Sequence, residues 1–243
     1  MADNQIIRFE DVRKQYGDKV IIPGFDLSIN SGEFIVIIGS SGCGKTTILK
    51  MINGLILPNQ GAVYVHGQDI QKENLIELRR RIGYVIQGSG LFPHMTAENN
   101  IAYVPNLFKK RDRKQIQETV RRLTKVVGLE EDVLKRFPSE LSGGQQQRVG
   151  IARALAANPE ILLMDEPFGA VDEITRKQLQ DEIKRIHESA GITIVFVTHD
   201  IQEALKLGTR VLVMDGGRAL QFDTPEHITA APANSFVEEL IQG

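Results

Sequence analysis

Four apolar runs set the framework of the chain. Phe34 to Ile38, Ile82 to Ile86, Ile161 to Met164 and Ile192 to Val197 contain few polar positions and lack the alternation of a half-exposed strand. Continuous runs of this length are typical of strands buried on both faces of a parallel sheet. Because segments with helical periodicity separate them, we predict a three-layer α/β core with a mainly parallel sheet.

Shorter alternating segments flank this framework. Ile6 to Val12 and Phe25 to Ile29 alternate apolar and polar side chains, as half-buried antiparallel strands do, and we place a turn at Pro23-Gly24. Val211 to Met214 and Arg218 to Phe222 are separated by a Gly-rich turn, which predicts a late hairpin. The chain therefore adds an N-terminal antiparallel β subdomain to its parallel core.

A helical insertion interrupts the strand pattern between Gln87 and Pro138. Apolar residues recur there at helical spacing among many charges, namely Ile116, Val120, Leu123 and Val126 or Val127. The charge cluster from Lys109 to Lys114 is either a patch that faces a membrane or partner, or the solvated start of a helix. We predict a single domain over residues 1–243, with a core at about 1–87 and 155–243 and a helical subdomain at about 88–154.

Composition narrows the class of protein. The formal net charge is −2, so no global basic field exists to hold a nucleic-acid backbone, and we expect no nucleic-acid partner. No apolar stretch approaches the roughly 20 residues needed to span a bilayer. The N-terminal residues lack the basic and apolar regions of a secretory signal, and the single cysteine, Cys43, suits a reducing compartment.

The segment from Gly39 to Thr46 has the pattern Gly-x-x-x-x-Gly-Lys-Thr. It begins where an apolar strand ends and leads into a helical stretch, which is the order that a phosphate-binding P-loop requires. Its glycines let successive backbone N–H groups face inward above a helix start that attracts phosphate. The alternative is an ordinary Gly-rich turn. We predict that the phosphates of ATP contact Gly39, Ser40, Ser41, Gly42, Cys43, Gly44, Lys45, Thr46 and Thr47.

Three side chains of this loop have distinct chemistry. Lys45 supplies a point charge to the β- and γ-phosphates, and the Thr46 hydroxyl is a hard oxygen ligand suited to Mg²⁺. Cys43 is either a reactive thiol near a helix N-terminus or a small residue of which only the backbone N–H matters.

Two acids follow a buried strand. Asp165 and Glu166 come directly after Ile161 to Met164, at the carboxyl end where open α/β sheets bind ligands. Because strand side chains alternate, the two point in different directions. We therefore assign Asp165 to Mg²⁺ and Glu166 to the general base that activates the attacking water. The alternative is that both acids only cap a helix.

Further polar residues lie at the ends of strands or the starts of helices. Gln87 follows the strand that ends at Ile86, and its amide oxygen is able to reach a metal or a water. His199 ends the strand from Ile192 to Thr198 and is expected at the same edge of the sheet. Leu141 to Gln145, with the sequence Leu-Ser-Gly-Gly-Gln, precedes a long helical stretch and is either a plain Ser N-cap or a second anion site.

Taken together, these motifs resemble the ATP-binding subunits of ABC transporters over almost the whole chain. The resemblance implies a P-loop NTPase core that binds ATP and Mg²⁺ and hydrolyses ATP. It assigns adenine stacking to Tyr16, the Q-loop to Gln87, the Walker B acid and the catalytic glutamate to Asp165 and Glu166, the D-loop acid to Asp172 and the switch histidine to His199.

The resemblance also implies partners. In the family, two cassettes pair head to tail, so that Ser142, Gly143, Gly144, Gln145 and Asp172 of one copy face the ATP held by the other. The helical insertion and the segment after Gln87 would then contact a transmembrane permease at the cytoplasmic face of the membrane. An extracytoplasmic substrate-binding protein would act on this chain indirectly, through the permease.

Four segments look like the ATPases of osmoprotectant importers for glycine betaine, choline or carnitine, namely Gly90 to Thr96, Ile101 to Pro105, Val195 to Asp200 and Glu203 to Gly208. Import of an amino acid or another small polar solute stays open. An ABC-type ATPase that acts on DNA or ribosomes is disfavoured, because the chain has one cassette and no sustained heptad run. A simple P-loop kinase would leave Leu141 to Gln145 and His199 without a role.

Overall fold

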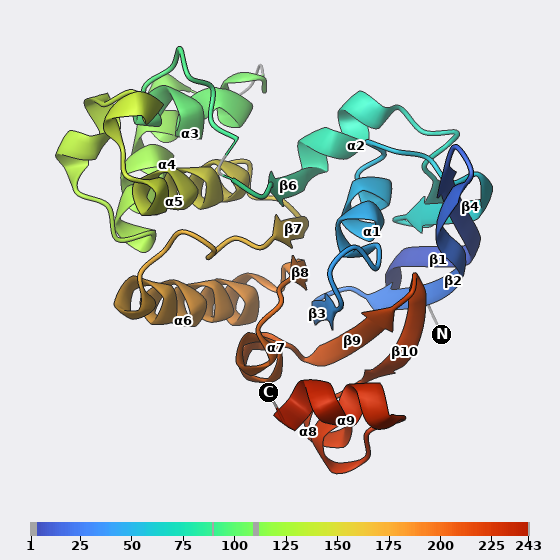
Figure 1. Ribbon diagram of the computed structural model, residues 1–243. Coiled ribbons are helices and arrows are strands. Elements are labelled where there is room, and N and C mark those ends of the chain that lie inside the picture. Colours follow the sequence, from blue (N-terminus) through green and yellow to red (C-terminus); the bar gives the residue numbers. More distant parts are fainter. Residues whose placement is uncertain (1–3, 89, 109–111, 243) are drawn as a thin grey trace. The chain divides into compact units, whose positions relative to one another are not determined.

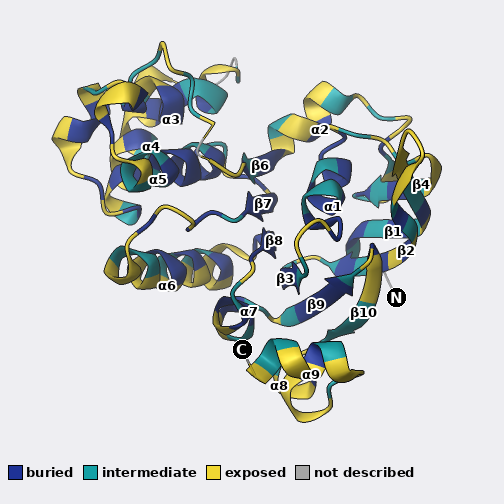
Figure 2. Cartoon of the chain, in the orientation of Figure 1, coloured by how far each residue is buried: buried dark blue, intermediate teal, exposed yellow. Residues whose placement is uncertain are grey.

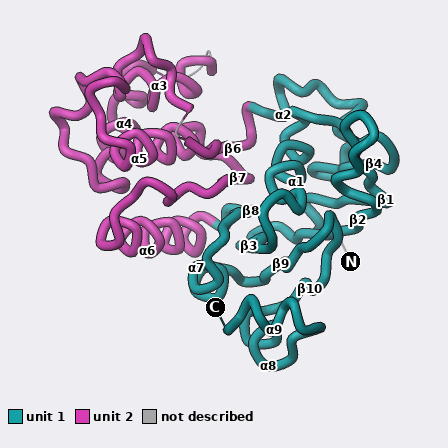
Figure 3. The backbone as a smooth tube through the Cα atoms, in the orientation of Figure 1, with its two compact units in different colours: residues 1–79, 191–243 teal, residues 80–190 magenta. Residues whose placement is uncertain are grey.

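The computed structural model describes residues 4–88, 90–108 and 112–242. It contains two compact units, unit 1 of residues 1–79 and 191–243 and unit 2 of residues 80–190 (Figure 3). The charge cluster predicted from Lys109 to Lys114 falls partly on residues 109–111, which lie outside the described residues.

Unit 1 carries most of the strands (Figure 1). Its elements are β1 (Gln5–Tyr16), β2 (Lys19–Asn30), β3 (Phe34–Gly39), α1 (Lys45–Ile52), β4 (Gln60–Val65), β5 (Gln68–Asp69), β8 (Thr193–Val197), α7 (Ile201–Leu207), β9 (Arg210–Asp215), β10 (Arg218–Asp223), α8 (Pro225–Ala230) and α9 (Ser235–Gln242). Helix α2 (Leu75–Arg81) leads from unit 1 into unit 2.

The N-terminal sheet of unit 1 has the strand order β2-β1-β4-β5, and every pair in it is antiparallel. Ile7 pairs with Ile29 on one side and Val65 on the other, and all three side chains are buried. Phe9 packs edge to face on Phe25, with 5.3 Å between the ring centroids. The predicted antiparallel β subdomain is confirmed.

The turn predicted at Pro23-Gly24 is wrong. Strand β2 continues through both residues, and the chain turns earlier, at Gly17-Asp18, where Gly17 has a φ of 55°. Strand β2 lies at the edge of its sheet, and its register with β1 shifts beside Pro23. A bulged edge strand tolerates a residue that has no backbone N–H, because one side of the strand needs no partner.

The second sheet of unit 1 has the order β10-β9-β3-β8. Strand β3 is parallel to both β8 and β9, whereas β10 pairs antiparallel with β9 and forms the predicted hairpin. The residues from Phe34 to Ile38 are all 0% exposed. The prediction of a strand buried on both faces is confirmed (Figure 2).

Unit 2 combines two parallel strands with most of the long helices. Its elements are β6 (Ile82–Val85), α3 (Ala97–Asn106), α4 (Arg113–Val126), the 3₁₀ turns η1 (Glu131–Lys135) and η2 (Pro138–Glu140), α5 (Gly143–Leu155), β7 (Ile161–Asp165) and α6 (Glu173–Ala190). Strands β6 and β7 pair in parallel register from Ile82 and Ile161. Helix α4 buries Ile116, Val120 and Leu123, as their spacing predicts.

Candidate functional site

The loop between β3 and α1 has a backbone that only glycine accommodates at its ends. Gly39 has a φ of 152°, and a Cβ atom there would lie 1.8 Å from the carbonyl oxygen of Met214. Gly44 is the N-cap of α1 with a φ of 105°. The glycines therefore allow the loop to pass close to β9 and to start α1 directly after it.

Lys45 is folded back onto its own loop. The side chain is 9% exposed, and Nζ donates hydrogen bonds to the carbonyl oxygens of Gly39 at 2.7 Å and Ser40 at 2.9 Å. Thr46 and Thr47 follow in the first turn of α1 and are half-buried, while Cys43 is buried. The two hydrogen bonds therefore hold the amine against the backbone at the start of the loop.

Asp215 takes part in this loop, although no sequence motif points to it. Ser40 Oγ donates a hydrogen bond to Asp215 Oδ1 at 2.5 Å. Asp215 is the last residue of β9, next to the turn at Gly216-Gly217. The hairpin therefore fixes the start of the loop through a side-chain contact that spans 175 residues of sequence.

Tyr16 and His199 also belong to unit 1. Tyr16 ends β1 with 51% of its surface exposed, and Lys14 Nζ lies 5.0 Å from its ring centroid. His199 is exposed in the segment between β8, which ends at Val197, and α7. Strand β8 is therefore one residue shorter at each end than the predicted strand from Ile192 to Thr198, and the Thr198 hydroxyl donates to Glu203 Oε2 at 2.6 Å instead.

In unit 2, two predicted site residues meet. Gln87 Nε2 donates a hydrogen bond to Glu166 Oε2 at 3.0 Å. Asp165, the last residue of β7, is 3% exposed, and Glu166 directly after it has a φ of 45°. A positive φ is uncommon for a residue with a side chain and is found mainly in turns and at functional sites.

A tyrosine accompanies these acids. Tyr84 lies in β6, the parallel neighbour of β7. Burial and, after it, the nearby negative charge of Asp165 raise the pKa of the Tyr84 phenol well above its usual value. The phenol therefore remains a neutral hydrogen-bond donor throughout the physiological pH range.

The motif from Leu141 to Gln145 forms a capped helix start. Ser142 is the N-cap of α5, its Oγ accepts from the Gln145 backbone N–H at 3.2 Å, and Gln145 Oε1 accepts from the Ser142 N–H at 3.0 Å. This reciprocal pair is a capping box. Ser142 and Gly143 are exposed, so the start of α5 faces solvent.

Asp172 is fully exposed just before α6. Its carboxylate accepts a hydrogen bond from the Thr175 backbone N–H at 3.0 Å. That bond is the main cause that lowers the pKa of Asp172, and the positive charge of Arg148 adds to it.

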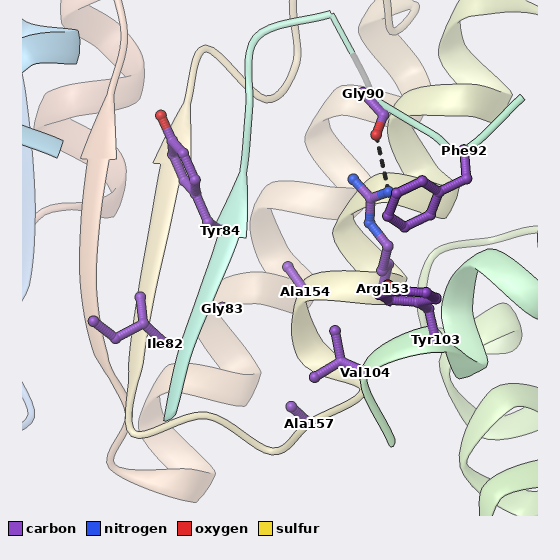
Figure 4. A pocket seen from close by; sticks show the side chains of 10 residues that line it. All are labelled: Ile82, Gly83, Tyr84, Gly90, Phe92, Tyr103, Val104, Arg153, Ala154 and Ala157. Carbon is purple, nitrogen blue, oxygen red and sulfur yellow. Dashed lines mark hydrogen bonds between the residues drawn. The ribbon is translucent and has the colours of Figure 1, made fainter. Parts of the chain in front are cut away.

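A cavity of about 260 Å³ lies in unit 2, beside Gly90 and Phe92 of the segment that follows Gln87 (Figure 4). Its lining is mostly apolar and consists of Ile82, Gly83, Tyr84, Gly90, Phe92, Tyr103, Val104, Arg153, Ala154 and Ala157. Arg153 Nη1 donates to the Gly90 carbonyl oxygen at 2.9 Å, and its guanidinium lies 5.5 Å from the Phe92 ring centroid. Burial lowers the pKa of Arg153.

The strand, Gly-rich loop and helix of unit 1 place the chain in the P-loop class of α/β proteins. Comparison with known proteins narrows the class. The family model described as ABC transporter matches residues 22–169. The chain belongs to the ABC transporter family.

Two relatives illustrate the match. The chain is 52% identical to a carnitine transport ATP-binding protein of Listeria monocytogenes over 237 residues, which are 97% of this chain and 59% of that protein. It is 48% identical to a glycine betaine uptake system ATP-binding protein of Escherichia coli over 96% of this chain and 76% of that protein. The chain thus spans about three-fifths of the length of the first relative.

Solved structures confirm the fold. A bacterial ABC transporter cassette determined as a dimer has a TM-score of 0.85 at 34% identity, and the match covers 90% of this chain and 98% of that one. A dimeric post-hydrolysis state of an ATP-binding cassette, bound to ADP and phosphate, has a TM-score of 0.84 at 33% identity over the same shares of the two chains. No helix among the described residues is long and apolar enough to cross a membrane.

Proposed function

We propose that this chain is the ATP-binding and ATP-hydrolysing subunit of an importer for a quaternary ammonium osmoprotectant such as glycine betaine, carnitine or choline. The observation that carries the proposal is the agreement among relatives at 48 to 52% identity, whose names specify carnitine, choline and glycine betaine transport. Relatives named for other solutes, such as spermidine and putrescine, match at 45% identity.

The loop residues from Gly39 to Thr47 hold the phosphates of ATP in this proposal. Backbone N–H groups and the start of α1 supply positive potential, and Lys45 exchanges its bonds to the loop carbonyl oxygens for bonds to phosphate. Tyr16, exposed at the end of β1, stacks on the adenine ring.

The chemistry of the donor residues fits Mg²⁺. Thr46 offers a hydroxyl, Asp165 a carboxylate and Gln87 an amide oxygen that its bond to Glu166 leaves free to coordinate. Hard oxygen ligands of this kind are what Mg²⁺ prefers, together with phosphate oxygens and water. Bound there, the ion would neutralise charge on the β- and γ-phosphates.

Glu166 acts as the general base. Its carboxylate accepts a hydrogen bond from Gln87 and takes a proton from the attacking water. His199, exposed beyond β8, contacts the γ-phosphate and supports the same step.

The chain works as a head-to-tail dimer in this proposal. Ser142, Gly143, Gly144, Gln145 and Asp172 of one copy complete the ATP site of the other copy. The exposed start of α5 supports this role, because a helix N-terminus carries a partial positive charge that attracts an anion. The solved relatives with the same fold were determined as dimers.

The cavity behind the segment after Gln87 receives the permease at the cytoplasmic face of the membrane. An apolar lining with a few polar groups suits a short segment of a partner protein. The residues around Gly90, Phe92 and Val104 belong to the helical subdomain, proposed at about 88–154, and they would carry the closing of the dimer to the permease.

The experiment is to purify the full chain with its membrane partners in detergent and to identify the permease and binding protein that accompany it. Glycine betaine, carnitine, choline, spermidine and sulfate are then titrated into that binding protein by calorimetry. We expect binding of a trimethylammonium compound. Binding of spermidine or sulfate alone would contradict the proposed substrate.

Two variants test the docking site in the same purification. Val104→Asp places a carboxylate in the apolar cavity and is expected to release the permease, whereas Gln117→Asp makes the same charge change on the exposed side of α4 and should retain it. Equal recovery of the permease with both variants would contradict docking at this cavity.

A further inference from the structure

Gln147 connects two segments of unit 2 that are far apart in the sequence. It lies in the second turn of α5 and is 6% exposed. Its Oε1 accepts a hydrogen bond from the Ala170 backbone N–H at 2.8 Å. Ala170 belongs to the loop from Glu166 to Asp172, which joins β7 to α6.

The start of α5 also rests directly on this loop. A Cβ atom on Gly144 would lie 3.1 Å from the Ala170 carbonyl oxygen, and one on Gly143 would lie 3.4 Å from the Ala170 Cβ. The first of these distances is tighter than ordinary van der Waals contact. The two glycines therefore bring the backbone of the helix start onto Ala170.

The loop itself is a series of short turns. The Gly169 N–H donates to the Glu166 carbonyl oxygen at 3.4 Å, and the Val171 N–H donates to the Phe168 carbonyl oxygen at 3.1 Å. Ala170 lies within the second of these turns, four residues after Glu166. A bond that fixes Ala170 therefore restricts both ends of the loop.

We propose that Gln147 is a positioning residue that couples Glu166 of a cassette to the Ser142-Gly143-Gly144 segment which the same cassette presents to its partner. The proposal rests on the proposed function, in which Glu166 serves one ATP and Ser142 serves the other. Any shift of α5 on closing against the partner's ATP is passed through Gln147 and Ala170 to Glu166. The two sites of the dimer then hydrolyse ATP cooperatively.

Three variants of the full chain separate this role from simple packing. Gln147→Met keeps the approximate length of the side chain but removes the acceptor, while Gln147→Glu keeps an acceptor oxygen in place. Gln146→Met is the matched control, because Gln146 Nε2 donates instead to the carbonyl oxygens of Pro138 and Leu141.

The first measurement is hydrogen exchange of the unliganded protein. Gln147→Met should speed exchange of the Ala170 amide about tenfold, as expected for the loss of one hydrogen bond. It should also speed exchange across both residues 142–146 and 166–172, and Gln147→Glu should restore the parental rates. Unchanged exchange in Gln147→Met, or the same change in Gln146→Met, would contradict the positioning role of Gln147. This conclusion does not depend on the ATPase activity of the variants.

The second measurement is ATP hydrolysis as a function of ATP concentration. Gln147→Met is expected to lower the Hill coefficient from about 2 toward 1 and to lower kcat about tenfold, with ATP binding to the isolated chain unchanged. Parental cooperativity in Gln147→Met overturns the coupling, and so does failure of Gln147→Glu to restore it. A parental chain that hydrolyses no ATP contradicts the proposed function. The exchange measurement tests the positioning role of Gln147 independently of that result.

Discussion

The amide nitrogen of Gln87 donates a hydrogen bond to the carboxylate of Glu166 across 3.0 Å, although 79 residues separate them in the sequence. Each side chain follows a strand of a parallel pair, β6 for Gln87 and β7 for Glu166. Parallel strands bring their carboxyl ends to one edge, which is why residues so far apart in the chain meet. The contact therefore fixes one oxygen of the Glu166 carboxylate.

Replacement of Glu166 by glutamine should separate ATP binding from hydrolysis. Loss of a general base costs about 10²- to 10⁴-fold in rate, so Glu166→Gln should lower kcat by at least the smaller factor. Because the P-loop is untouched, ATP still binds, and the dimer that hydrolysis would open accumulates. Light scattering with ATP and Mg²⁺ measures the dimer, and a phosphate-release assay measures turnover.

Glu173→Gln is the matched control, since Glu173 is an exposed acid that pairs with Lys177 at the start of α6. It should hydrolyse ATP at the parental rate. If Glu166→Gln also hydrolyses normally, the general base lies elsewhere.

Replacement of Gly83 by alanine should destabilise the fold, because α5 packs closely against β6 at this position. A Cβ atom there would lie 2.6 Å from the Ala154 carbonyl oxygen and 2.9 Å from Leu162 Cδ1. Overpacking of this kind costs about 1–3 kcal/mol, so Gly83→Ala should lower Tm by about 2–12 °C. Thermal unfolding followed by circular dichroism measures the shift.

Gly24→Ala is the comparison variant, because nothing lies within 4 Å of a Cβ atom there. We expect its Tm to stay within about 2 °C of the parent, as for most surface substitutions. Equal losses in the two variants would show that the contact with Ala154 is not the cause.

Local patterns in the sequence predict the buried framework well. The continuous run from Phe34 to Ile38 predicts a fully buried strand, and the spacing of Ile116, Val120 and Leu123 predicts the buried face of α4. Both predictions depend on periodicity, which a single segment carries by itself.

Features that depend on tertiary context were missed. Pro23 is read as a turn from its local chemistry, yet the edge position of β2 lets the strand continue through it. Strand β4 also escaped prediction, because its short alternating segment from Gln60 to Val65 becomes recognisable only beside β1.

The site shows the same limit. The P-loop and the paired acids have contiguous motifs, so the sequence alone predicts candidates for both. The contacts of Asp215 with Ser40 and of Gln147 with Ala170 join residues 175 and 23 positions apart. No short motif contains both members of either pair, and only the folded chain brings them together.

In the proposed dimer, two copies of the chain share each ATP site, and mixed dimers of two variants test this sharing. Ser142→Arg and Lys45→Ala each damage both sites of their own homodimer. A mixed dimer keeps one site with an intact Lys45 from one chain and an intact Ser142 from the other.

An equal mixture of the two inactive variants should therefore regain at most about a quarter of the parental ATPase rate, because half of the dimers are mixed and each retains one of two sites. The rate falls below this ceiling to the extent that hydrolysis depends on cooperation between the sites. The measurement is phosphate release by the mixture beside each variant alone. Shared sites predict a rate well above the sum of the two variants. A mixture no more active than that sum, or a Ser142→Arg variant fully active by itself, would contradict the claim.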